Sequence, residues 1–339
     1  MSVVSADWPL YVSHAQCTHS SRSSGAMIGL IADAVMPIAW VLGLGFLLKR
    51  YAPLDGSLWR GLEWLSYWLL MPSLLISVIV SAPQIHVPWP ALLASLYGTL
   101  GGLTVVLFVG WGLQWFGPSY PRFTSVYQGV IRFNTFIALA VVAGLDATLL
   151  PQMGISAAVI IVAINVACVS VMTAGTSDRA LRTISRELIR NPLILACCLG
   201  GFLRMVGMPA SFPISGLALV GQAALPMGVL CLGAGIRWHA IRNGLSLNAA
   251  VLTLIFVVKP LLFLALGVSF DLDAEWLLVG LLLMSVSTAP SSYILAKQLG
   301  GDADLMAGMV AIQTLVSMIS LPVTLWFVDK AGFIALAAM

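Results

Sequence analysis

Residues 276–303 read WLLVGLLLMSVSTAPSSYILAKQLGGDA. The run from Leu277 to Met284 is continuously apolar, whereas a strand of a transmembrane barrel would alternate apolar and polar residues, so the run indicates a membrane helix. Pro290 follows in the same stretch. Because proline lacks a backbone donor and clashes with the preceding helical turn, it predicts a break in that helix.

The composition of the whole chain excludes a soluble domain. Of the 339 residues, 60% are apolar and only 9% are charged, and the mean hydropathy is +1.01. A soluble domain has about a quarter of its residues charged, whereas a lipid-facing surface needs no polar side chains. No basic stretch with interleaved aromatic residues indicates nucleic acid, and the five cysteines form no CxxC pair. We therefore expect an all-α membrane protein with no metal site, no cofactor and no nucleic-acid partner.

Ten segments are apolar over the roughly 20 residues that a bilayer-spanning helix needs. The predicted spans are 28–48, 62–81, 91–115, 124–145, 153–173, 192–208, 214–236, 246–268, 276–297 and 303–328. They divide into a first five-helix repeat at 27–173 and a second at 192–339, joined by a basic loop at 174–191. Residues 1–26 are polar and lack a long apolar core, so we expect a disordered tail that is not a signal peptide.

The distribution of basic residues predicts the orientation. Of the 16 Lys and Arg residues, eleven fall in loops on one side, three on the side that carries both termini, and two inside spans. Loops rich in Lys and Arg stay in the cytoplasm. We therefore expect a multi-pass protein of the cell inner (plasma) membrane, with both termini outside the cytoplasm and the loop 174–191 inside.

The two halves of the chain match each other at a common offset of 156 residues. Gly45-Phe46-Leu47 corresponds to Gly201-Phe202-Leu203, Asn134 to Pro290, and Gly144-Leu145-Asp146-Ala147 to Gly300-Gly301-Asp302-Ala303. Because each half has an odd number of spans, the second half enters the membrane from the opposite side. The pattern predicts an inverted repeat, which is a common construction of secondary transporters.

Four motifs resemble those of the auxin efflux carrier family of bacterial and plant permeases. They are Gln128-Gly129 with Arg132-Phe133-Asn134-Thr135, Arg190-Asn191-Pro192-Leu193-Ile194, Gly221-Gln222-Ala223-Ala224-Leu225-Pro226, and Ala289-Pro290-Ser291-Ser292-Tyr293-Ile294-Leu295-Ala296 with Gly300-Gly301-Asp302-Ala303. The last is the most specific, and the resemblance covers residues 28–328.

The resemblance implies ten transmembrane helices in two five-helix inverted repeats, with helices 4 and 9 broken and crossing at mid-membrane beside the substrate site. It also implies small organic anions as substrates and an architecture similar to that of sodium–bile acid symporters. Members of the family usually carry Gly and Pro soon after the fourth-span Asn, but residues 135–140 contain neither. The break in helix 4 is thus implied by the resemblance and not by local residues.

Seven residues are candidates for substrate binding: Gln128, Arg132, Asn134, Lys259, Pro290, Ser291 and Ser292. Arg132 lies deep in the fourth span, where a charge must face a cavity or a partner, so it contacts an anion or forms a structural ion pair. Lys259 is a similar candidate, but its flexible stem could instead snorkel to the surface. The other polar candidates would bind ligand or satisfy backbone groups that Pro290 frees. Gln313, a lone polar residue in the last span, is typical of contacts between helices.

We therefore expect a secondary transporter, a permease or efflux carrier, that moves a small organic anion such as a carboxylate by alternating access. The sequence has no catalytic signature such as HExxH or a nucleotide-binding fingerprint, so no enzyme is expected. Two alternatives stay open. One is a non-transporting membrane sensor or scaffold on the same fold, which the missing Gly and Pro favour. The other is an ion-coupled symporter of the bile-acid-carrier type, which would need clustered acidic groups. Proton or sodium coupling and a homodimer are also left open.

Overall fold

The computed structural model describes residues 24–83, 85–173, 183, 185–186, 189–207, 213–236 and 245–333, and the side chains at 24–28 and 245–248 are not described. Residues 1–23 of the predicted disordered tail therefore lie outside the described residues. Most of the loop 174–191 does so as well. In the part of the chain that is described, the regular structure is helical and contains no strand.

The helices follow one another from the N-terminus without any sheet between them. Their bounds are α1 (Ser24–Tyr51), α2 (Gly56–Leu65), η1 (Ser66–Leu70), α3 (Met71–Ser81), α4 (Trp89–Gly112), α5 (Tyr120–Ile131), α6 (Thr135–Leu145), η2 (Ala147–Leu149), α7 (Leu150–Met172), α9 (Pro192–Val206), α10 (Ile214–Gly221), α11 (Ala224–Ala234), α13 (Leu245–Thr253), η3 (Leu254–Val258), α14 (Lys259–Ser269), α15 (Ala274–Ser285), α16 (Ser291–Leu299) and α17 (Ala303–Lys330).

Eight helical segments of the described chain are long and apolar enough to cross a membrane. They are Gly29–Tyr51, Gly56–Ser81, Trp89–Gly112, Tyr120–Leu145, Ala147–Met172, Ile214–Ala234, Ala249–Ser269 and Ala303–Lys330. The predicted span 192–208 coincides with a shorter apolar helix, Pro192–Val206, and another, Ala274–Ser285, covers only the first part of the predicted span 276–297. The prediction of a multi-pass, all-α membrane protein is therefore confirmed.

Proline residues explain two irregular turns inside these segments. The π-helical turns η1 and η3 come directly before Met71-Pro72 and Lys259-Pro260. A proline cannot donate to the carbonyl four residues earlier, and a widened turn accommodates both the missing bond and the ring. The helices continue past these turns, so the prolines distort the segments without ending them.

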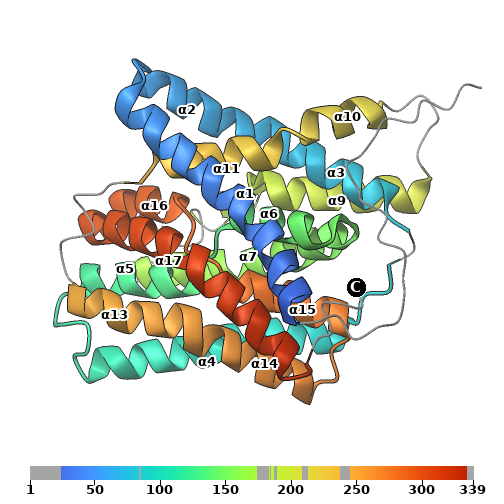
Figure 1. Ribbon diagram of the computed structural model, residues 1–339. Helices are drawn as coiled ribbons and strands as arrows, with labels where there is room; N and C mark the ends of the chain where they lie inside the picture. Colours follow the sequence, from blue (N-terminus) through green and yellow to red (C-terminus); the bar gives the residue numbers. More distant parts are fainter. Residues whose placement is uncertain are drawn as a thin grey trace, which may run out of the picture.

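Glycines allow helices from the two halves of the chain to approach closely. Helix α1 packs against α11, and α9 packs against α3. A Cβ atom on Gly45 would lie 2.0 Å from the carbonyl oxygen of Leu230, and one on Gly233 would lie 1.9 Å from that of Leu42. The backbones of α1 and α11 are thus in direct contact, as small residues permit in membrane proteins. Figure 1 shows α2, α3, α10 and α11 together at the top of the view and α4, α13 and α14 at the bottom.

Candidate functional site

Two helices of the protein interior are interrupted, and the interruptions touch. Helix α5 ends at Ile131 and α6 begins at Thr135, while α15 ends at Ser285 and α16 begins at Ser291. The backbone N–H of Asn134 in the first break donates to the carbonyl oxygen of Ser287 in the second, at 2.7 Å. The fourth helix is therefore broken without the Gly and Pro that family members carry.

Asn134 explains how the chain restarts as a helix after the first break. It is the N-cap of α6, and its Oδ1 accepts from the backbone N–H groups of Phe136 at 3.1 Å and Ile137 at 3.4 Å. The first N–H groups of a helix have no partner inside the helix, and asparagine is among the best residues to supply one. Asn134 is 1% exposed, so this cap is formed out of reach of water.

Lys259 explains how α5 can end inside the protein. Its Nζ donates to the carbonyl oxygens of Val130 at 3.0 Å, Ile131 at 3.4 Å and Arg132 at 3.2 Å. The last carbonyls of a helix lack internal partners, and a cation there also faces the negative end of the helix dipole. Lys259 is only 1% exposed. The interpretation that this side chain snorkels to the surface is therefore wrong.

The remaining carbonyls at the end of α5 also have partners. The carbonyl oxygen of Gln128 accepts from the backbone N–H of Arg132 at 3.0 Å and from the hydroxyl of Thr288 at 3.4 Å. The carbonyl oxygen of Gly129 accepts from Nε2 of Gln313 at 3.2 Å. Every one of the last four carbonyls of α5 thus has a donor, so the break carries no unsatisfied helix end on this side.

The second break is held by the same Gln313. Its Oε1 accepts from the backbone N–H of Thr288 at 2.9 Å, while its Nε2 reaches the first break. Pro290 would clash with the carbonyl four residues earlier, which accounts for the end of α15 at Ser285. The prediction that Gln313 joins helices is confirmed. Sequence reasoning missed Thr288, which is one of several small hydroxyl residues in Ser285-Val286-Ser287-Thr288 and has no feature that separates it from its neighbours.

Arg132 lies between the two half-helices of the first break. Its Nη2 donates to Oγ of Ser291 at 3.4 Å, and its Nη1 is buried and has no hydrogen-bond partner among the described residues. No carboxylate pairs with this guanidinium in the described part of the chain. The structural ion pair that was one of the two interpretations of Arg132 is thus not found among those residues.

Three side chains, in the last turn of α5 and in the first break, hold buried polar atoms without hydrogen-bond partners among the described residues. These atoms are Nε2 and Oε1 of Gln128, Nη1 of Arg132 and Nδ2 of Asn134. Gln128 is fully buried, at 0% exposed. A buried polar group left unsatisfied costs about 1–3 kcal/mol, so such a group needs an explanation. Three of the four atoms are donors, which matches a ligand that is rich in acceptors.

The other predicted residues lie at the start of α16. Pro290 and Ser291 are exposed, whereas Ser292 is buried and its Oγ shares a hydrogen bond of 3.2 Å with the hydroxyl of Thr288. The structure therefore gathers all seven candidates at the two breaks. Arg132 and Ser291 touch directly, and Ser292 is linked to the first break through Thr288.

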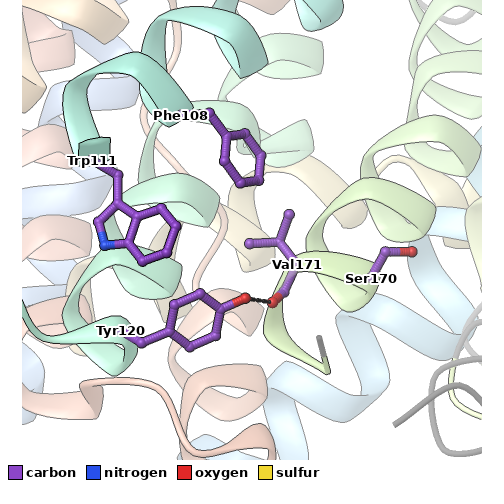
Figure 2. Close-up of a pocket in the computed structure, with 5 residues that line it drawn as sticks. All are labelled: Phe108, Trp111, Tyr120, Ser170 and Val171. Atoms are coloured by element: carbon purple, nitrogen blue, oxygen red, sulfur yellow. Dashed lines mark hydrogen bonds between the residues drawn. The ribbon is translucent and has the colours of Figure 1, made fainter. Parts of the chain in front are cut away.

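A groove near the start of α5 is a separate feature. Figure 2 shows its five lining residues, Phe108, Trp111, Tyr120, Ser170 and Val171, and the hydrogen bond from the Tyr120 hydroxyl to the Val171 carbonyl oxygen. It encloses about 510 Å³ and its lining is mainly apolar. Tyr120 precedes Arg132 by about 18 Å along the helix axis. With no charged lining residue, the groove does not form part of the candidate site.

A multi-pass helical protein whose interior holds two broken helices in contact, with buried donors between them, has the features of a membrane transporter. The model of a family described as "membrane transport protein" matches residues 90–325, which is more than half of the chain. The chain belongs to this family, the auxin efflux carrier family that its motifs resemble. The family that the motifs predicted is therefore confirmed.

One curated relative adds a weaker likeness. The chain is 27% identical over 147 residues to an "uncharacterized transporter" of Methanothermobacter thermautotrophicus. The match covers 43% of this chain and 47% of the relative, so it spans about half the length of each protein.

Proposed function

We propose that the protein is a secondary transporter that moves a small organic anion, a carboxylate, across the cell inner membrane by alternating access. The observation that carries this proposal is a set of buried donors that have no partner within the described ranges: Nε2 of Gln128, Nη1 of Arg132 and Nδ2 of Asn134. They come from one short stretch of chain where two broken helices meet.

The chemistry of this stretch suits an anion. An anion that enters the membrane interior loses its hydration and needs positive charge and donors in return. Arg132 supplies a full charge in a planar fork that matches a carboxylate, and Asn134 supplies a directed donor. Helices α6 and α16 both begin at the breaks, so the positive ends of their dipoles lie there as well. Ser291, which already contacts Arg132, adds a hydroxyl.

The packing of the helices supports the proposed inverted repeat of ten spans. If residues 27–173 correspond to residues 192–339, α1 corresponds to α9, and the segment of α2 and α3 to that of α10 and α11. The contact of α1 with α11 then has its counterpart in the contact of α9 with α3, and that of α5 with α17 in that of α15 with α7. In this proposal the broken helices cross at mid-membrane, and both termini lie outside the cytoplasm.

The non-transporting sensor or scaffold loses its one supporting feature. That alternative depended on the missing Gly and Pro after Asn134. Because Asn134 and Lys259 hold the break without either residue, the absence no longer argues against a working transport site.

The test is uptake by proteoliposomes that contain the purified protein, across a panel of monocarboxylates and dicarboxylates. We expect saturable uptake or exchange of at least one of them. Arg132→Ala should reduce that transport by on the order of 100-fold, since the loss of a charged hydrogen bond of about 1.5–3 kcal/mol corresponds to roughly 10- to 150-fold. The control is Arg50→Ala, at the exposed end of α1, which should transport normally.

Two outcomes would contradict the proposal. A wild-type protein that binds and moves no carboxylate would reject the substrate class. Arg132→Ala with full uptake would reject the anion contact. If Arg132→Ala unfolds in mild detergent while Arg50→Ala does not, Arg132 serves the structure and not the substrate.

A further inference from the structure

The structure assigns to the Lys259 ammonium the role of a tethered cation: it fills a monovalent-cation site that the backbone carbonyls at the end of α5 would otherwise form. The protein then needs no sodium ion at this break. This inference goes beyond the proposed function, because it concerns the coupling ion and not the substrate.

The oxygen cluster is a product of the break itself. In a continuous helix the carbonyls of Val130 and Ile131 would accept from the N–H groups of residues 134 and 135. Here the N–H of Asn134 donates to Ser287 of the other break, and three carbonyl oxygens converge instead on one nitrogen, at 3.0, 3.4 and 3.2 Å. Unwound carbonyls and the C-terminal ends of half-helices are the groups that bind sodium in secondary transporters, and carbonyl rings also replace the hydration shell of potassium.

The number of hydrogen bonds shows that Lys259 is fully occupied by this cluster. An ammonium group has three N–H donors, and Lys259 has three carbonyl partners. It therefore keeps no donor for a substrate, in contrast to Arg132, whose Nη1 is unused. The two cations of the site thus have different tasks: Arg132 faces the ligand, and Lys259 stabilises the backbone of the break.

The surroundings of Lys259 fit a cation site in which backbone carbonyl dipoles, and not carboxylates, balance the positive charge. Within the described part of the chain its hydrogen-bond partners are backbone carbonyls only, and no group of three or more His, Cys, Asp or Glu residues there could hold a metal ion. A sodium-coupled site of the bile-acid-carrier type would use clustered acidic groups. With a lysine in place of a mobile ion, the cation at the end of α5 is covalently attached to the protein.

The experiment measures thermal unfolding of the purified protein in detergent, with no substrate present. The wild type, Lys259→Ala and Lys259→Met are each heated in sodium, potassium, methylammonium or choline chloride at equal ionic strength. Lys259→Ala vacates the cluster, whereas the methionine of Lys259→Met fills the space without a charge. Choline is too large for the cluster and controls for ionic strength.

We expect the wild type to have the same Tm in all four salts. Lys259→Ala should have a lower Tm that methylammonium, which restores an –NH₃⁺ group, raises by on the order of 2–4 °C above the value in choline. Sodium or potassium should raise it less, and Lys259→Met should show no such rescue.

A sodium-specific rise in the Tm of the wild type would overturn the inference, as would a folded Lys259→Ala protein that no cation stabilises relative to choline. If neither variant folds, the wild type decides: a sodium-specific rise refutes the tethered cation, and equal Tm values in the four salts support it. Because no substrate is used, either result leaves the proposed carboxylate transport to be judged separately.

Discussion

Replacing Asn134 by alanine removes two contributions that can be measured apart. The first is the N-cap of α6, made at 3.1 and 3.4 Å to the backbone N–H groups of Phe136 and Ile137. The second is Nδ2, a buried donor with no partner among the described residues. The chain offers a matched control in Asn191, the N-cap of α9. Its Oδ1 accepts from the backbone N–H groups of Leu193 at 3.0 Å and Ile194 at 3.3 Å, which are the equivalent two positions.

The stability effects of the two alanine variants should be alike. Loss of an asparagine N-cap costs about 1 kcal/mol, within a range of 0.5–2 kcal/mol. For a chain of this size we expect Tm to fall by about 1–3 °C in both Asn134→Ala and Asn191→Ala. Thermal unfolding in detergent measures this directly, and both variants should still be inserted and folded.

The effects on transport should differ. Of these two variants, only Asn134→Ala should lose most uptake of the carboxylate that the wild type transports, because Asn134 lies in the break and has a buried donor without a partner among the described residues. Asn134→Asp keeps the capping oxygen but replaces the donor with a negative charge, so it should be at least as stable as Asn134→Ala and equally inactive. Equal transport by Asn134→Ala and Asn191→Ala would refute a role for the amide beyond capping.

Three further predictions concern packing and topology. Gly45→Ala should destabilise the protein by about 1–3 kcal/mol, since its Cβ would lie 2.0 Å from a carbonyl oxygen of α11, whereas Gly43→Ala, with nothing within 4 Å, should be neutral or slightly stabilising in thermal unfolding. Gln313→Leu should lower stability by about 1–3 kcal/mol, because it leaves a backbone N–H in one break and a carbonyl in the other without partners, and a wild-type Tm would contradict the bridge. In a cysteine-free background, a membrane-impermeant maleimide added to intact cells should label Asp273→Cys and not Asp55→Cys, and the reverse labelling would reject the predicted orientation.

Hydropathy was sufficient to predict the eight helical segments that are long and apolar enough to cross a membrane. The fourth predicted span, 124–145, lies within the segment Tyr120–Leu145, and the last, 303–328, nearly equals Ala303–Lys330. The second segment begins at Gly56, six residues before the prediction, because the exposed charges of Arg60 and Glu63 lower the hydropathy of its first turns without ending the helix.

The break in the ninth span could be predicted because its cause is local, but that in the fourth could not. Pro290 acts on its own turn, whereas α5 ends where Lys259, about 130 residues later, reaches its carbonyls. A sequence window around Asn134 contains neither that lysine nor Gln313. The same reason accounts for the error on Lys259. Its distance from the membrane surface can be read from the sequence, but the presence of three free carbonyls near it cannot.

The contact between α1 and α11 has a consequence for biogenesis. Gly45 and Gly233 lie on helices that are about 190 residues apart in the chain, and each glycine lies against the backbone of the other helix. At a synthesis rate of about 5–20 residues per second, α1 waits roughly 10–40 s in the membrane before its partner leaves the ribosome. During that interval lipid or an insertion chaperone must cover the face of α1 at Gly45 that α11 later contacts. If the first half of the chain were synthesised alone, α1 would therefore leave the membrane-insertion machinery without having formed its close contact with α11.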